Sequence, residues 1–120
     1  MNALGTPIVG NAQFKLRCNH GPANATGLGI VCDAQDSAGS DPFGLGFILH
    51  LDLFTAVEIL TFDLVSDAAG VGTAAAPIPQ NPFLAGKTYY AQTLWRWDPG
   101  ICLPSTFGIS SSNGLAITIQ

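Results

Sequence analysis

The chain has 120 residues, of which 48% are hydrophobic and only 10% are charged, against about 25% charged residues in typical globular domains. This composition excludes a disordered chain, and it excludes a charge-rich helical bundle or coiled coil. Four basic residues against eight acidic ones give a formal net charge of −4, so nucleic acid is not an expected partner. The length fits one domain, residues 1–120.

The first half of the chain repeats its hydrophobic residues with a period of two, which is typical of half-buried strands. Turn-forming and polar residues separate the segments that have this period. The pattern predicts strands at residues 14–18, 28–33, 47–53 and 57–65. The first two strands would pair as a hairpin, and residues 34–44 would form a polar loop.

The second half contains a proline-rich stretch that interrupts the strand pattern. Pro77, Pro79 and Pro82 remove three backbone donors, so residues 77–82 are predicted to form an extended surface connection. Asn113-Gly114 is a candidate type I′ hairpin turn between the last two strands. The remaining pattern predicts a turn at residues 66–70 and strands at residues 71–76, 87–97, 106–111 and 115–119.

About eight short strands with no substantial helix predict an all-β fold, an antiparallel β-sandwich of jelly-roll-like character. Gly-x-Gly spacings occur, but no helix follows them, so a phosphate-binding loop is not predicted. The longest apolar region, residues 45–65, is interrupted by charged and polar residues and falls short of the about 20 apolar residues that span a membrane. We therefore predict no membrane insertion.

Three cysteines allow at most one internal disulfide. In the predicted hairpin Cys18 would lie opposite Leu28 rather than Cys32, which makes a Cys18–Cys32 bridge geometrically unfavourable. A Cys32–Cys102 bridge or no bridge is then expected. Two histidines without a Cys-x-x-Cys pair do not predict a zinc site.

Short motifs follow one another along nearly the whole chain: Gly5-Thr6-Pro7, Phe14-Lys15-Leu16, Leu49-His50-Leu51-Asp52-Leu53, Val65-Ser66-Asp67-Ala68-Ala69-Gly70, Pro77-Ile78-Pro79-Gln80-Asn81-Pro82, Leu84-Ala85-Gly86, Tyr89-Tyr90-Ala91-Gln92 and Ser111-Ser112-Asn113-Gly114-Leu115-Ala116-Ile117-Thr118. In this order they resemble a Gly/Ala/Pro-rich β-module found in secreted proteins of environmental, planctomycete-type bacteria, often at the C-terminus. The resemblance implies an extracellular or cell-surface β-sandwich without an assigned catalytic site. It also implies a signal peptide upstream of this sequence.

The strand at residues 87–97 carries the most informative candidate binding site. Tyr89, Trp95 and Trp97 are predicted to share one face of this strand, with the two indoles about 7 Å apart. Such rings can form a flat platform for a sugar ring, and they can equally form a core or a subunit contact. The sequence leaves both interpretations open.

Asp33, Asp36 and Asp41 fall within one predicted loop, where hard oxygen ligands could surround Ca²⁺. Their spacing does not match the known calcium-loop pattern. The alternative interpretation is that these three carboxylates are solvated acids of a surface loop and bind no metal. No other metal and no cofactor is predicted. No serine lies in a Gly-x-Ser-x-Gly motif, and no catalytic residue is predicted.

The low charge also predicts how the surface is used. A domain with so few charged residues must cover its surface with small, neutral and apolar groups, which soluble monomers avoid. The sequence therefore predicts a non-catalytic extracellular structural or attachment module that self-associates into a homo-oligomer or larger assembly. The alternative is a carbohydrate-binding, lectin-like module that holds a neutral glycan on Tyr89, Trp95 and Trp97.

Overall fold

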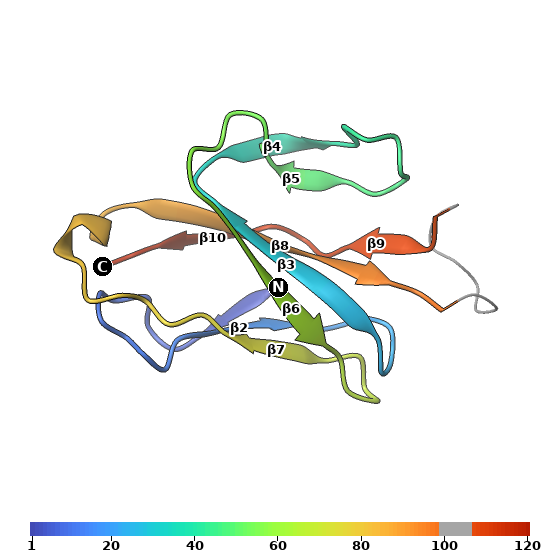
Figure 1. Ribbon diagram of the computed structural model, residues 1–120, viewed down its shortest axis with the longest axis horizontal. Helices are drawn as coiled ribbons and strands as arrows, with labels where there is room; N and C mark the ends of the chain where they lie inside the picture. The colour runs from blue at the N-terminus through green and yellow to red at the C-terminus, as the bar shows by residue number, and fades with distance from the viewer. Residues whose placement is uncertain (99–106) are drawn as a thin grey trace.

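Figure 1 shows a computed structural model of the chain, which describes residues 1–98 and 107–120. These residues form ten strands and one short 3₁₀ helix, η1 (Pro82–Leu84). All of the strand pairs are antiparallel, and the sheets pack against one another in layers. The predicted all-β sandwich without substantial helix is confirmed, with ten strands rather than about eight.

The central sheet has the order β10-β8-β3-β6, and β9 pairs with the same edge of β8 as β10 does. Within it β8 and β3 are inner strands, whereas β6 lies at the outer edge. Apart from the short β9, these segments are rich in β-branched, aromatic or aliphatic residues, which suit a pleated and partly buried surface. The strands are β3 (Thr26–Cys32), β6 (Ile59–Val65), β8 (Thr88–Arg96), β9 (Ile109–Ser111) and β10 (Leu115–Thr118).

Two smaller sheets lie on the two faces of the central sheet, as Figure 1 shows. One has the order β1-β2-β7, from β1 (Asn2–Leu4), β2 (Lys15–Cys18) and β7 (Gly72–Ala75). The other pairs β4 (Gln35–Ser40) with β5 (Leu49–Leu51) and covers only one end of its face. The two faces of the central sheet are therefore covered to different extents.

The hydrophobic core is divided by the central sheet. Between it and β1-β2-β7 lie two buried clusters, one around Phe14, Leu16 and Tyr89 and the other formed by Cys18, Leu64 and Trp95. A smaller cluster of Ile30, Cys32 and Leu51 lies on the opposite face, under β5. Side chains on both faces of strand β8 are buried.

Gln92, in the middle of β8, fastens the β4-β5 sheet to the central sheet. Its side chain is fully buried, and its Oε1 accepts a hydrogen bond from the backbone N–H of His50 at 2.8 Å. Its Nε2 donates to the carbonyl oxygens of Ile48 at 2.9 Å and Ser112 at 2.7 Å. One amide thus forms hydrogen bonds with three backbone groups, which also provides the partners that a buried polar side chain needs.

The structure corrects the predicted hairpin of the first two strands. β2 pairs with β1 and β7, whereas β3 pairs with β6 and β8, so the two segments belong to different sheets. The seven residues 19–25, rich in turn formers, allow the chain to cross from one layer to the other. The predicted polar loop at residues 34–44 is also wrong in part, because β4 lies within it and pairs with β5 despite its exposed, polar side chains.

Asn113-Gly114 does not form the predicted hairpin turn. Ser111 lies opposite Leu94 and Leu115 lies opposite Ala91, so four residue steps on one strand match three on the other. The segment is therefore a one-residue bulge between two strands that continue along one edge of β8. The Asn113 side chain accepts a hydrogen bond from the N-terminal amine of Met1, which stabilises this irregular segment.

Candidate functional site

Two of the three predicted platform residues are buried in the sandwich. The side chain of Trp95 is 2% exposed, and its Nε1 lies 3.4 Å from the Sγ of Cys18, to which it donates. Added Cβ atoms at Gly27 and Gly72 would lie 2.5 and 2.7 Å from the Trp95 ring, so these glycines provide the space that the indole occupies. Tyr89 is 9% exposed and belongs to the other core cluster.

The predicted aromatic residues are not brought together into one flat surface. Tyr89 and Trp95 are six residues apart on β8, which corresponds to about 20 Å along a strand. Trp97 follows the strand, is half-buried, and donates from its Nε1 to the Oγ of Ser110 at 2.8 Å. The structure therefore gives Tyr89 and Trp95 core roles, and Trp97 fastens β9 to the end of β8.

The three candidate calcium ligands each accept hydrogen bonds from a different stretch of backbone. Asp33 accepts from the N–H groups of Val57 and Glu58, and Asp36 accepts from Gly39. Asp41 accepts from Leu45 and Gly46, and these hydrogen bonds lower the pKa of its carboxyl group. Within residues 1–98 and 107–120, no group of three or more His, Cys, Asp or Glu side chains is placed to hold a metal ion.

The cysteines of the described segments are buried thiols. Cys18 and Cys32 are not joined to each other, and burial raises the pKa of the Cys32 thiol. The expected alternative, a Cys32–Cys102 bridge, involves a residue outside the described segments.

The feature that the sequence did not reveal is the open edge formed by β6. In the central sheet β6 pairs with β3, and in the described segments its other edge is met only at its end, where Ser66 forms an isolated bridge with Gly72 of β7. Five of its seven residues are exposed, and Ile59, Leu60 and Val65 are 45%, 66% and 66% exposed. A long apolar edge strand is a template for pairing with another strand.

The free backbone groups of this edge can be identified from its pairing. The N–H of Asp33 donates to the carbonyl of Glu58, and the N–H of Ser66 donates to the carbonyl of Ala25. Backbone groups alternate in direction along an antiparallel strand, so the even-numbered residues of β6 face β3. The N–H and C=O groups of Ile59, Thr61 and Asp63 therefore point away from the sheet, whereas the outward side of Val65 lies beside the Ser66–Gly72 bridge to β7.

An apolar cleft of about 660 Å³ opens beside β6, on the face toward β1-β2-β7. Strands β6 and β7 are joined by a turn at residues 66–71 and lie apart at their other ends (Figure 1). Leu60 and Phe62 of β6 line one wall and residues 75–79 line the other, with Phe14 and Leu16 of the core behind them. One side of the sandwich core is thus incompletely closed.

A small polar network lies at the margin of this cleft. The hydroxyl of Tyr89 donates to Oε2 of Glu58, and Nζ of Lys87 donates to Oε1 of the same carboxylate at 3.2 Å. These hydrogen bonds lower the pKa of Glu58. Burial, followed by the hydrogen bond to Glu58, raises the pKa of Tyr89 to about 12. The network ties β8 to the residue that precedes β6.

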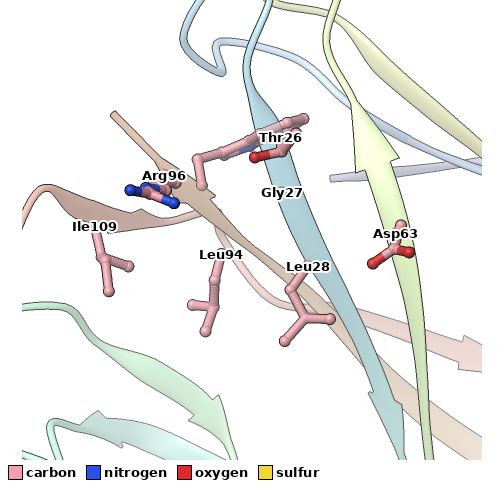
Figure 2. A pocket seen from close by; sticks show the side chains of 8 residues that line it. Thr26, Gly27, Leu28, Asp63, Leu94, Arg96 and Ile109 are labelled. Atoms are coloured by element: carbon pink, nitrogen blue, oxygen red, sulfur yellow. The ribbon is translucent and has the colours of Figure 1, made fainter. Parts of the chain in front are cut away.

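The opposite face of β6 borders a shallow depression of about 340 Å³, which Figure 2 shows. Leu28 and Leu94 form its apolar floor, and Asp63 and Arg96 stand on opposite sides of β3. This is the part of the central sheet that β4 and β5 leave uncovered. Strand β6 thus has apolar surface on both faces as well as a free edge.

No protein-family model, curated protein or solved structure matches this chain. In the described segments, no helix has the length and apolar character needed to cross a membrane. The open edge could have been suspected from the nearly continuous apolar run of β6, which is typical of a strand that is covered on both faces. The sequence pattern alone does not show whether the residues that cover such a strand belong to the same chain.

Proposed function

We propose that this protein is a non-catalytic structural or attachment module that self-associates into a homo-oligomer or larger assembly. The observation that carries the proposal is the amount of large apolar side chain on its surface, since twelve such residues are exposed in the described segments. Phe54, Val57 and Phe83 are 75%, 88% and 83% exposed. Soluble monomers rarely leave extensive apolar surface uncovered, so a contact with another subunit accounts for it.

The total surface area supports the same proposal. A compact monomer of 12.4 kDa exposes about 6,100 Å². This chain exposes 6703 Å², and it is flat, with extents of 48 × 31 × 17 Å. The excess of about 600 Å² is comparable with the about 800 Å² that each partner buries in a stable interface.

The carbohydrate-binding alternative is less well supported by the geometry. It required an exposed platform of Tyr89, Trp95 and Trp97, whereas Trp95 is buried and Tyr89 packs in the core. Self-association needs no rearrangement of the core, because the apolar groups it uses are already on the surface. Location outside the cell is proposed from the motif resemblance alone.

Sedimentation of the purified chain over a range of concentrations tests the proposal. We expect a species whose mass is a multiple of 12.4 kDa and whose population grows with protein concentration. High salt should preserve it, because apolar contacts are not screened as ion pairs are. A single 12.4 kDa species at every concentration would overturn the proposal.

A further inference from the structure

We propose that the outer edge of β6 and the apolar cleft beside it bind an extended segment of another protein, which adds one short strand to the central sheet. The N–H and C=O groups of Ile59 and Thr61 point outward, and both residues line the cleft. An antiparallel segment forms two hydrogen bonds with each of them, or up to about four in all. Main-chain groups spaced in this way match a polypeptide, and an alkyl chain leaves them without partners.

The proposed pairing ends before the contact between β6 and β7. Ser66 forms an isolated bridge with Gly72, so β7 lies beside the last residues of β6. From that point the two strands diverge, and the cleft lies between residues 57–62 on one side and residues 75–79 on the other. A segment that pairs only opposite residues 58–62 therefore lies along the open part of the edge.

The cleft determines which side chains of the bound segment are apolar. Leu60 and Phe62 lie on the face of β6 that borders the cleft, and directly opposite residues of an antiparallel pair share a face. The residues opposite Leu60 and Phe62 therefore project into a cleft of about 660 Å³ that is lined mainly by apolar side chains. They also cover Leu60, which is 66% exposed. The site thus selects an apolar residue at every second position.

The margin of the cleft adds a preference for positive charge. The carboxylate of Glu58 accepts one hydrogen bond from Lys87 and one from Tyr89, whereas a carboxylate has about four acceptor positions. Asp33 accepts from the backbone N–H of Glu58, so a second carboxylate lies close by. Two carboxylates and one ammonium group leave this margin with a charge of −1. A lysine or arginine opposite Glu58 complements that charge.

The need for a basic residue also identifies the source of the segment as a protein other than this chain. The chain has only four basic residues. Lys15 and Arg17 belong to β2, which lies between β1 and β7, and Arg96 belongs to β8, which lies between β3 and β9. Lys87 already forms an ion pair with Glu58 of its own chain. A second copy therefore has no unpaired basic strand to offer, and the inference does not rest on self-association.

A synthetic peptide tests the proposal at concentrations where the chain is monomeric. The probe is acetyl-Val-Thr-Val-Thr-Lys-amide, whose valines fall opposite Phe62 and Leu60 and whose lysine falls opposite Glu58. Its titration into the isotope-labelled full chain should shift the NMR signals of the Ile59 and Thr61 amides most, because these N–H groups gain partners. The dissociation constant follows from the same titration.

Peptide N-methylation tests the strand pairing without changing the protein. In the proposed register the N–H of each threonine points to β6, so N-methylation of either threonine should raise the dissociation constant about tenfold or more. The N–H of the second valine points away from β6. N-methylation there is the matched control, and it should change the dissociation constant by less than about twofold.

A double comparison tests the charge preference. Replacing the peptide lysine by glutamine should weaken binding about two- to fivefold, as for one exposed ion pair. In the Glu58→Gln variant, whose side-chain oxygen still accepts from Tyr89, the lysine and glutamine peptides should bind equally. Both peptides keep the same valine and threonine contacts, so the comparison isolates the charge.

A protein variant and an alkyl probe complete the set of outcomes. Thr61→Pro removes an outward N–H, a position where edge strands accept proline, and should weaken peptide binding about tenfold with an unchanged circular dichroism spectrum. Weakening by the methylated threonines and by Thr61→Pro, with the valine control retained, supports the inference. It is overturned if the peptide causes no shifts, if all methylated peptides bind alike, or if n-octylamine, which has no backbone groups, binds equally well. Sedimentation of the chain alone is independent of these outcomes, so self-association is judged separately.

Discussion

Strands β8 and β6 lie on the two sides of β3 in the same sheet, and both are strongly apolar, yet their environments differ completely. β8 has β9 and β10 on its far edge and packed layers on both faces, and most of its side chains are buried. β6 is met on its far edge only at its end, by the bridge between Ser66 and Gly72 of β7, and most of its side chains are exposed. Position in the sheet, rather than residue composition, determines which of the two is part of the core.

The largest expected difference between these strands comes from truncating one large side chain in each. Trp95→Ala should lower the free energy of unfolding by about 3–5 kcal/mol, because it leaves a cavity among Cys18, Leu64 and the glycines around the ring. Leu60→Ala on β6 should cost less than about 1 kcal/mol, since Leu60 is 66% exposed. Urea unfolding followed by far-ultraviolet circular dichroism, at concentrations where the chain is monomeric, measures both.

Equal losses for the two variants would contradict this comparison. They would mean that β6 is covered within a single chain, or that the Trp95 site collapses around the smaller residue. Weakened association of the Leu60→Ala variant with an unchanged monomer would instead support the proposed self-association.

An intermediate effect is expected from the polar link between β8 and the β4-β5 sheet. Gln92→Leu keeps the approximate size of the side chain but removes the partners of Ile48, His50 and Ser112, which should cost about 2–3 kcal/mol. Gln35→Leu, the same change at an exposed position on β4, should alter stability by less than about 0.5 kcal/mol. Faster amide exchange at His50 in the Gln92 variant would locate the loss. Similar stability for the two variants would show that Gln92 is not structural.

Local sequence patterns predict most of the strands, because hydrophobic and polar side chains alternate along a half-buried strand. The predicted segments at residues 14–18 and 57–65 contain β2 and β6, and the predicted segment at residues 28–33 overlaps most of β3. Partners were harder to predict, since pairing joins segments far apart in sequence. β3, for example, pairs with β6 and β8 rather than with the neighbouring β2.

The candidate site was predicted less well than the fold, for the same physical reason. Trp95 is buried because Gly21, Gly27 and Gly72, from three separate segments, converge around its ring, and no local pattern shows this convergence. The sequence pattern predicts a loop where β4 lies, because the β4 side chains are mostly polar or small and its strand conformation depends on pairing with β5. The free edge of β6 likewise depends on which strands lie beside it.

The smallest expected effect concerns the hydroxyl of Tyr89, which connects β8 to the start of β6 through Glu58. Tyr89→Phe should cost about 1 kcal/mol at neutral pH, because it removes one hydrogen bond to a partly exposed carboxylate. The pKa of Tyr89 is raised to about 12 in the folded chain, against about 10 when unfolded. The stability that this shift provides is fully present below pH 10, and it is lost as the pH rises toward 12, because the unfolded chain releases the phenolic proton first.

The difference in unfolding free energy between wild type and Tyr89→Phe, measured at intervals from pH 7 to 12, isolates this group from other alkaline titrations. We expect the difference to be constant up to about pH 10 and then to shrink or change sign. A difference that does not vary with pH would show that the phenol titrates alike in both states. Because Tyr89 lies on the buried strand and Glu58 adjoins the open one, a flat profile would also mean that this hydrogen bond does not couple the stability of the two strands.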